Sequence, residues 1–201
     1  MDGRGGPKSD AFMLWIDAVG GYWVCLREVV TLGQPLPQGQ ADVPILADLS
    51  ARHARIRRDG EGYLIEALRE LHVDGRPVPQ LGWLNDGSRI DLGANVRLVF
   101  RRPHALSATA RLDFASRHRT QPSCDAVLLM ADTCVLGPKP QSHVVCRAWP
   151  HEVILYRQGD ELFCRTAGDL TIDGKHYRER GPLRRNSRVE GETFSFSLEA
   201  M

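Results

Sequence analysis

The sequence predicts an all-β protein built from β-sandwiches, and four observations support this prediction. The chain consists of short runs rich in β-branched and aromatic residues, with turn residues between them. In the run VRLVFRR, the residues Val96, Leu98 and Phe100 fall on one side of the expected strand. No segment carries an apolar stripe of helical period with caps at its ends. The spacing of the turns is typical of sandwiches.

The first segments of the chain carry no signal for export or for a membrane. Met1–Asp10 has no apolar periodicity and is predicted to be a disordered tail. The apolar run Ala11–Leu26 is interrupted by Asp17 and by a Gly-Gly pair, so it predicts neither a membrane span nor a secretory signal. We therefore expect a cytoplasmic protein without a membrane partner.

Two hairpins are predicted in the stretch that follows. HARIRRDGEGYLIEAL is expected to turn near Asp59 and Gly60. In LHVDGRPV, Asp74 and Gly75 supply the two positive-φ residues that a tight type I′ turn requires. Both of these residues are therefore expected to have a structural role.

The charges of the chain nearly cancel, with 26 basic and 25 acidic residues among 201. No overall field attracts nucleic acid or an anionic membrane, so nucleic acid is not an expected partner. One basic run, from Lys175 to Arg188, contains Glu179 as its one acidic residue, and Asp173 lies just before it. Two interpretations of it stay open: it meets RNA, DNA or an acidic partner, or it is exposed loop charge.

The five cysteines form no CxxC pair, and their odd number argues against a complete disulfide framework. We expect most of them to be reduced and buried. A zinc site can be drawn from Cys134, His143, Cys146 and His151, but these residues lack the closely spaced ligand pairs that are usual in such sites. Neither a metal nor any other cofactor is predicted.

The second half of the chain repeats the first. The run that starts at His53 parallels the run that starts at His151, and each ends on an Asp-Gly pair. Each Asp-Gly pair precedes a Ser-Arg-apolar triplet, at Ser88 and at Ser187, by the same interval. We therefore predict two sandwiches in tandem, with a tail over 1–10, a first domain over 11–103, a connector over 104–123 and a second domain over 124–201.

With these features in order, the first half resembles a forkhead-associated (FHA) domain. The runs ADVPILADLSARHARI and LNDGSRIDLGANVRLVF carry the resemblance, which covers about residues 12–102. It implies an antiparallel β-sandwich whose loops at one end bind phosphothreonine peptides. It also implies a non-enzymatic interaction module in a Ser/Thr-kinase pathway. The expected partner is a threonine-phosphorylated protein or peptide, and a second candidate partner is the kinase itself.

The resemblance assigns roles residue by residue. Ser50 falls on the phosphate-binding serine, and His53 falls on the histidine that props the recognition loop from behind. Gly33 matches the glycine of a Gly-Arg pair, but Gln34 stands in place of the arginine. Asp74 and Gly75 match a structural Asn-Gly turn of the family.

Two arginines are candidates to replace the missing charge. Arg52 lies one place after the position of the arginine that usually follows the serine, and Arg69 lies near a ligand-facing asparagine of the family. We prefer Arg69, because its guanidinium can reach back and bind two phosphate oxygens. The predicted phosphopeptide-binding residues are Gly33, Gln34, Ser50, Arg52 and Arg69.

The second half resembles a degenerate copy of the same domain. Its Gly137 is followed by Pro138, and Ala148 stands in place of the serine. An alternative function is therefore a phosphate-independent scaffold or assembly module with an FHA-like fold. Ser50 and His53 could also be a hydrolase pair, but no nucleophile elbow and no orienting acid accompany them, so no catalytic residue is predicted.

Overall fold

The computed structural model describes residues 10–37, 41–60 and 62–201, and every regular element within these ranges is a β-strand. The prediction of an all-β fold is confirmed. Within the same ranges, no helix has the length and the apolar character that crossing a membrane requires. Apart from Asp10, the predicted disordered tail lies outside the described residues. Asp10 accepts a hydrogen bond from the amide of Leu26 at 2.8 Å.

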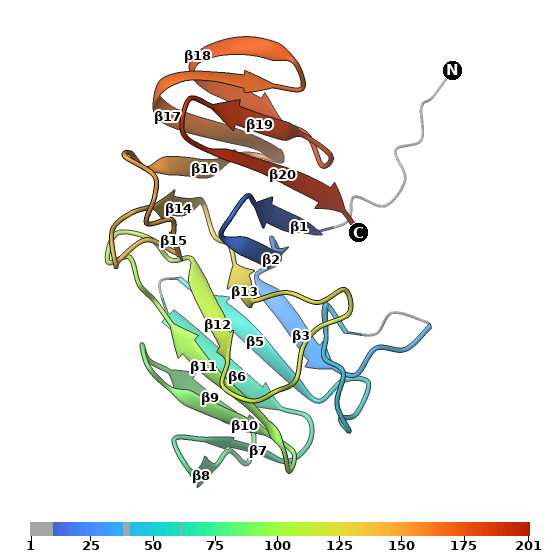
Figure 1. Cartoon of the computed structure of the whole chain (residues 1–201). Coiled ribbons are helices and arrows are strands. Elements are labelled where there is room, and N and C mark those ends of the chain that lie inside the picture. Colours follow the sequence, from blue (N-terminus) through green and yellow to red (C-terminus); the bar gives the residue numbers. More distant parts are fainter. Residues whose placement is uncertain (1–9, 38–40, 61) are drawn as a thin grey trace.

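The strands form two sheets (Figure 1). The smaller sheet has the spatial order β4 (Val43–Pro44), β3 (Val29–Gly33), β5 (Ala54–Asp59), β6 (Gly62–Ala67) and β9 (Leu81–Leu84). The larger sheet has the order β15 (Val144–Val145), β14 (Thr133–Gly137), β16 (Val153–Gln158), β17 (Glu161–Ile172), β19 (Arg188–Gly191), β20 (Ser195–Ala200), β1 (Ala11–Ile16), β2 (Gly20–Cys25), β13 (Ala126–Leu129), β12 (Ala110–Phe114), β11 (Val96–Arg101), β10 (Arg89–Leu92), β7 (Leu71–Val73) and β8 (Arg76–Pro77), and β18 (Lys175–Leu183) pairs with β17.

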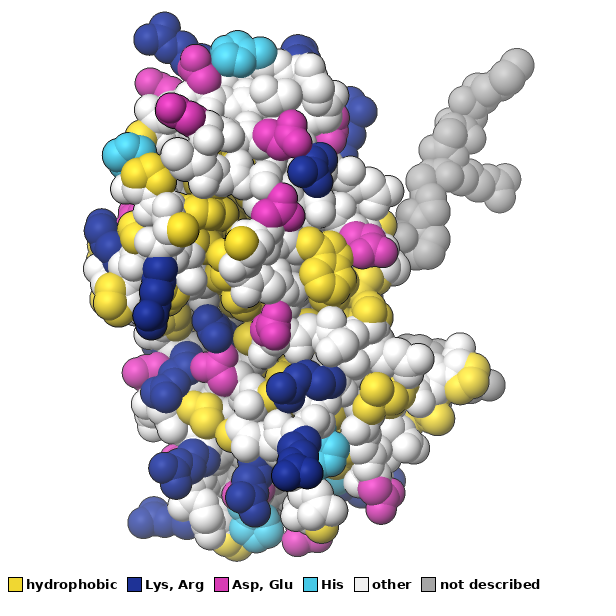
Figure 2. Space-filling view, in the orientation of Figure 1, with side chains coloured by type: hydrophobic (Ala, Val, Ile, Leu, Met, Phe, Trp, Pro, Cys, Tyr) yellow, Lys and Arg dark blue, Asp and Glu magenta, His cyan; other side chains and the backbone are white. Residues whose placement is uncertain are grey.

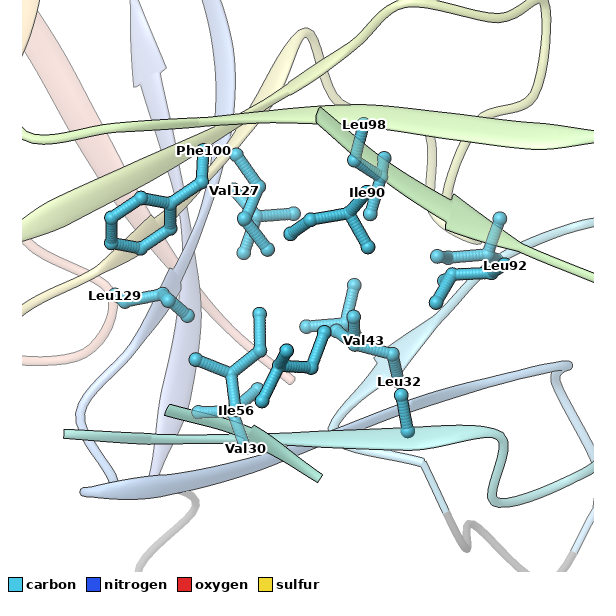
Figure 3. Close-up of a cluster of buried hydrophobic side chains, with 14 of the residues drawn as sticks. Val30, Leu32, Val43, Ile56, Ile90, Leu92, Leu98, Phe100, Val127 and Leu129 are labelled. Atoms are coloured by element: carbon cyan, nitrogen blue, oxygen red, sulfur yellow. The ribbon is translucent and has the colours of Figure 1, made fainter. Parts of the chain in front are cut away.

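The first core lies between the smaller sheet and the part of the larger sheet that runs from β13 to β8. In β11, Val96, Leu98 and Phe100 are buried, as the alternation predicts. Val30 of β3 and Ile56 of β5 face them from the opposite layer (Figure 3). Burial of each such side chain stabilises the fold by roughly 1.5–3 kcal/mol.

The second core lies in the other half of the chain, where the long strand β17 serves both layers. Its first residues pair with β16 and its last residues pair with β19. Its pairing with β18 shifts register between Arg165 and Asp169. Leu155, Cys164 and Phe196 are fully buried in this core.

The strands β1, β2 and β13 form a layer that both cores share. In β13, Val127 and Leu129 face the first core, whereas Ala126 and Leu128 face the second. The side chains of β1 and β2 are divided between the two cores in the same way. β2 and β13 pair in parallel, which joins the two halves through one continuous sheet (Figure 1). Each half therefore helps to cover the core of the other.

Each half also contributes its first two strands to the sheet of the other half. β12 and β13 precede β14 in the chain, yet β12 pairs with β11 of the first half. β1 and β2 precede β3, yet β1 pairs with β20 of the second half. The two pairings correspond in register, since Leu98 lies opposite Phe114 as Phe196 lies opposite Ile16. The two hairpins have exchanged places within one chain.

This exchange bears on the predicted boundaries. β12 lies inside the stretch 104–123, which the sequence predicts to be a connector. Neither 11–103 nor 124–201 holds all of the strands that cover its own core. The division into two tandem domains stays a prediction.

Local geometry repeats at the two Asp-Gly turns. Asp74 and Asp173 have the same positive φ of 52°. The carboxylate of Asp74 accepts hydrogen bonds from Ser88 Oγ at 3.2 Å and from the amide of Arg89 at 2.8 Å. Asp173 accepts the same two bonds from its own Ser-Arg pair, both at 2.8 Å. The triplets therefore recur because the serine hydroxyl and the next amide bind the aspartate of the turn.

The strand register corrects one part of the alignment between the halves. Ala54, which pairs with Leu32 of β3, directly follows His53. In the second half, the residue that pairs with β14 in the same way is Val153, which lies opposite Leu136 and directly follows Glu152. The alignment of His53 with His151 is therefore wrong by one residue. The second half has a carboxylate at the position where the first half has an imidazole.

Another difference concerns the residue before each short parallel strand. Asp42 accepts a hydrogen bond from the amide of Thr31 at 2.8 Å, and Nδ1 of His143 accepts one from the amide of Val135 at 2.9 Å. His143 is fully buried, and its Nε2 has no hydrogen-bond partner among the described residues. Burial, followed by the charge of His104, lowers the pKa of His143 to about 4.

We expect the chain to unfold in one cooperative transition, because the two cores share the layer formed by β1, β2 and β13. Leu128→Ala and Leu129→Ala remove neighbouring side chains from different cores, and each should lower the free energy of unfolding by about 2–5 kcal/mol. Urea unfolding followed by tryptophan fluorescence and circular dichroism should show one transition that shifts in both variants. Two separate transitions, each sensitive to only one variant, would show that the two cores do not depend on a shared layer.

We also expect His143 to make the protein less stable in acid. The unfolded imidazole binds its proton near pH 6.5, whereas the folded one does so only near pH 4. Between these values the unfolded state holds more protons, so the free energy of unfolding falls as the pH is lowered, by on the order of 3 kcal/mol in total. His143→Asn keeps an acceptor for Val135 and removes the titration. The free energy of unfolding, measured by urea titration at a series of pH values, should depend less on pH in the variant than in the wild type. An equal pH dependence of the two proteins would refute the role of His143.

Candidate functional site

The loop end of the first sandwich is organised around His53, whose side chain is 5% exposed. Its Nδ1 accepts a hydrogen bond from the amide of Ser50 at 3.4 Å, and its Nε2 lies 2.8 Å from the carbonyl oxygen of Glu70. Because Nδ1 accepts, the ring proton must be on Nε2, which donates it to that carbonyl. This tautomer bridges the β4–β5 loop and the β6–β7 loop.

The backbone of His53 adds further contacts between the same loops. Its amide donates to the carbonyl of Leu32 at 2.8 Å, and its carbonyl accepts from the amide of Arg69 at 3.0 Å. The amide of Gly93, in the β10–β11 turn, donates to the carbonyl of Glu70 at 3.1 Å. One buried residue therefore connects the end of β3, the β6–β7 loop and, through Glu70, the β10–β11 turn.

Gly33 and Gln34 lie against the loop that carries Ser50. The amide of Gln34 donates to the carbonyl of Ser50 at 3.1 Å. A Cβ on Gly33 would overlap the carbonyl oxygen of Ala51 and would lie 2.8 Å from the carbonyl oxygen of Ser50. A side chain at this position would force the loops apart. The structure therefore brings Gly33, Gln34 and Ser50 together through their backbones.

The two candidate cations, Arg52 and Arg69, are both exposed. Arg69 donates from Nη1 to the carbonyl of Leu68 at 2.7 Å, which holds its guanidinium at the β6–β7 loop. Arg52 forms no ion pair with a carboxylate in the described part of the chain. Both guanidinium groups are accessible to an anion from solvent.

Asp74 and Gly75 do not join this group. They form the β7–β8 turn, with φ values of 52° and 76°, both positive as a type I′ turn requires. β7 leads from Glu70, beside His53, to this turn, so the turn lies at the other end of that strand. Their contacts are with Ser88 and Arg89, which are structural partners.

One neighbour of the site was missed by the sequence analysis. The loop between β12 and β13 meets the β4–β5 loop, where Thr120 forms an isolated antiparallel bridge with Ile45. The amide of Leu46 donates to the carbonyl of Arg119 at 2.8 Å. This pairing joins two residues, Ile45 and Thr120, that are far apart in the sequence, so no local pattern could have revealed it.

The zinc site and the cysteines considered in the sequence can be located in the structure. Among the described residues, no group of three or more His, Cys, Asp or Glu side chains could hold a metal ion, and the zinc set drawn from the sequence does not come together. All five cysteines are free and buried, as predicted. Burial raises the pKa of Cys134, Cys146 and Cys164 to about 12, so the thiolates that nucleophilic chemistry needs do not form near neutral pH.

Comparison with known proteins gives a consistent set of similar structures. No protein-family model and no curated protein sequence matches the chain. The FHA domain of FhaA, solved in complex with the intracellular domain of Rv3910, is 31% identical over 41% of this chain and 91% of its own, with a TM-score of 0.31. A structure from work on phosphothreonine-dependent FHA domain interactions is 32% identical over 41% of this chain and 88% of its own, with a TM-score of 0.31. EmbR of Mycobacterium tuberculosis, in complex with a low-affinity phosphopeptide, is 26% identical over 45% of this chain, with a TM-score of 0.35, and the chain spans only 24% of EmbR.

We expect Gly33→Ala to destabilise the loop end, because the added methyl group must displace the backbone of Ala51. The free energy of unfolding, measured by urea titration, should fall by about 1–3 kcal/mol. Gly168→Ala is the matched control, since a Cβ at Gly168 has open space around it. The control should change stability by no more than about 0.5 kcal/mol. Equal effects of the two substitutions would show that Gly33 is not held against the loop.

Proposed function

This chain has an FHA-like fold, and from that premise we propose that its first half captures threonine-phosphorylated segments of other proteins as a non-enzymatic interaction module. One observation carries the proposal: the segments that hold Gln34 and Arg69 are both hydrogen-bonded to the loop of Ser50 and the buried His53. A scaffold of this kind presents several donors in a fixed arrangement, as recognition of a phosphate requires.

The chemistry of capture follows from the groups at this loop end. A phosphate that carries close to two negative charges needs compensating charge or several hydrogen-bond donors. In our proposal, the Ser50 hydroxyl donates to one oxygen, and the Arg69 guanidinium binds two oxygens. Arg52 adds a second positive charge from the loop itself. Gly33 contributes by letting the two loops approach each other.

The neutral residue at position 34 limits the expected affinity. A hydrogen bond to a charged group is worth about 1.5–3 kcal/mol, so glutamine in place of arginine weakens phosphate binding about 10- to 150-fold. The proposed protein is therefore a weak phosphothreonine binder unless other contacts add to the affinity. A Ser/Thr kinase that marks the partner and a cytoplasmic setting belong to the same proposal.

A second candidate function is phosphate-independent assembly, and one observation favours it. Leu81 and Trp83 lie on β9, the edge strand of the smaller sheet, and their side chains are 55% and 63% exposed. Large apolar side chains on an open edge are typical of protein contact sites. In this case the loops around His53 would only maintain the fold.

The two candidates differ in their response to phosphate, which calorimetric titration with a phosphothreonine peptide and its unphosphorylated twin measures directly. We expect only the phosphorylated peptide to bind. Ser50→Ala and Arg69→Ala should each weaken binding by at least about 1 kcal/mol, because each removes a donor to the phosphate. Gln34→Arg should strengthen binding by about 10- to 150-fold.

Arg76→Ala is the matched control, because Arg76 is an exposed arginine on β8, beyond the Asp-Gly turn. Its substitution should leave the affinity unchanged. If neither the wild type nor Gln34→Arg distinguishes the two peptides, the phosphothreonine proposal fails and the assembly function takes its place.

A further inference from the structure

The loop between β12 and β13 builds a wall beside the candidate site, and the second half has no such wall. The counterpart of this loop is the β1–β2 turn, which spans only residues 17–19. That short turn leaves an open groove, lined also by Val145, Trp149 and Phe194. The β12–β13 loop spans residues 115–125 and closes onto the β4–β5 loop instead. The added length therefore lies where the first half carries its candidate site.

The wall is anchored at its middle and near β12. At its middle, Thr120 is fully buried, its Oγ1 donates to the carbonyl of Pro122 at 2.6 Å, and its backbone bridges to Ile45. Near β12, Ser116 Oγ accepts a hydrogen bond from the amide of Arg97 at 3.1 Å. A segment tied in this way is organised before a ligand arrives, which lowers the entropy cost of binding.

The wall presents positive charge to solvent. Arg117 and Arg119 are exposed, and neither forms an ion pair with a described carboxylate. Arg119 donates from Nη1 to the carbonyl of His118 at 2.8 Å, and its guanidinium lies 5.7 Å from the ring centre of Phe114. Figure 2 shows that basic side chains gather on the lower half of the molecule, the half in which the β12–β13 loop runs (Figure 1).

The wall and the candidate site border the same groove. Gln34 of the site, Pro44 before the recognition loop and Gln121 of the wall all line it. The amide of Gln121 donates to the carbonyl of Pro44 at 3.1 Å, so the wall is hydrogen-bonded directly to another residue that lines the groove. A peptide held by its phosphate near Gln34 and Ser50 can therefore extend along this groove and reach the wall.

We infer that Arg117 and Arg119 select peptides that carry Asp or Glu beside the phosphothreonine. This inference rests on the proposed function and names the class of peptide that the same site prefers. The charge of the wall complements an acidic flank. A site with neutral Gln34 draws less of its affinity from the phosphate, so the flank contributes a larger share. The hairpin that the second half contributes thus adds specificity to the site of the first half.

Fluorescence anisotropy with four labelled peptides tests this inference. The peptides combine a threonine, phosphorylated or not, with flanks of either aspartate or alanine. The wild-type protein should bind the phosphorylated acidic peptide about two- to five-fold more tightly for each acidic residue that reaches the wall, and added salt should reduce this preference. Arg117→Gln and Arg119→Gln should abolish the preference and leave the affinity for the phosphorylated alanine peptide unchanged.

A charge reversal separates a true contact from a general loss of structure. Arg117→Glu should favour a phosphorylated peptide with lysine flanks over its acidic counterpart. Arg178→Ala, at an exposed arginine of β18, is the matched control and should retain the wild-type preference. Equal binding of the phosphorylated acidic and alanine peptides overturns the inference alone. Absence of binding by every phosphorylated peptide overturns the proposed function and the inference together.

Discussion

The hydrogen bonds of the buried His53 are the constraint on which the loop end of this protein depends. The imidazole is hydrogen-bonded to Ser50 on one side and to Glu70 on the other. The backbone amide and carbonyl of His53 are hydrogen-bonded to Leu32 and Arg69. None of these loops has a regular structure that would hold it in place alone. The positions of the candidate phosphate-binding residues Gln34, Ser50 and Arg69 therefore depend on a buried residue behind them.

The exchange of hairpins makes the two halves of the chain one structural unit. Because β1, β2 and β13 each face two cores, the second half supports the first even though it lacks its own serine and histidine at the corresponding positions. The second half contributes β12 and β13 to the sheet of the first half, and between these strands runs the loop that borders the candidate site.

Much of the fold could be predicted from the sequence, because it depends on local patterns. The alternation that ends at Phe100 and the Asp74-Gly75 turn are each determined by neighbouring residues. The exchange could not be predicted. β13 has the sequence AVLL and is buried throughout, since its two faces lie in different cores, so it shows no alternation that would assign it to either half. In the site, the Ser-x-x-His motif indicated Ser50 and His53, whereas the β12–β13 loop meets the site only through long-range contacts.

We propose that the loops held by His53 bind phosphate. The most direct measurement is a two-dimensional ¹H–¹⁵N NMR titration of the whole chain with a phosphothreonine peptide. We predict that the amide signals of Gln34, Ser50 and Arg69 shift with the phosphorylated peptide, while those of Asp173 and Gly174 at the turn of the second half do not. If the same signals stay in place with the phosphorylated peptide, or move equally with its unphosphorylated twin, the claim is contradicted.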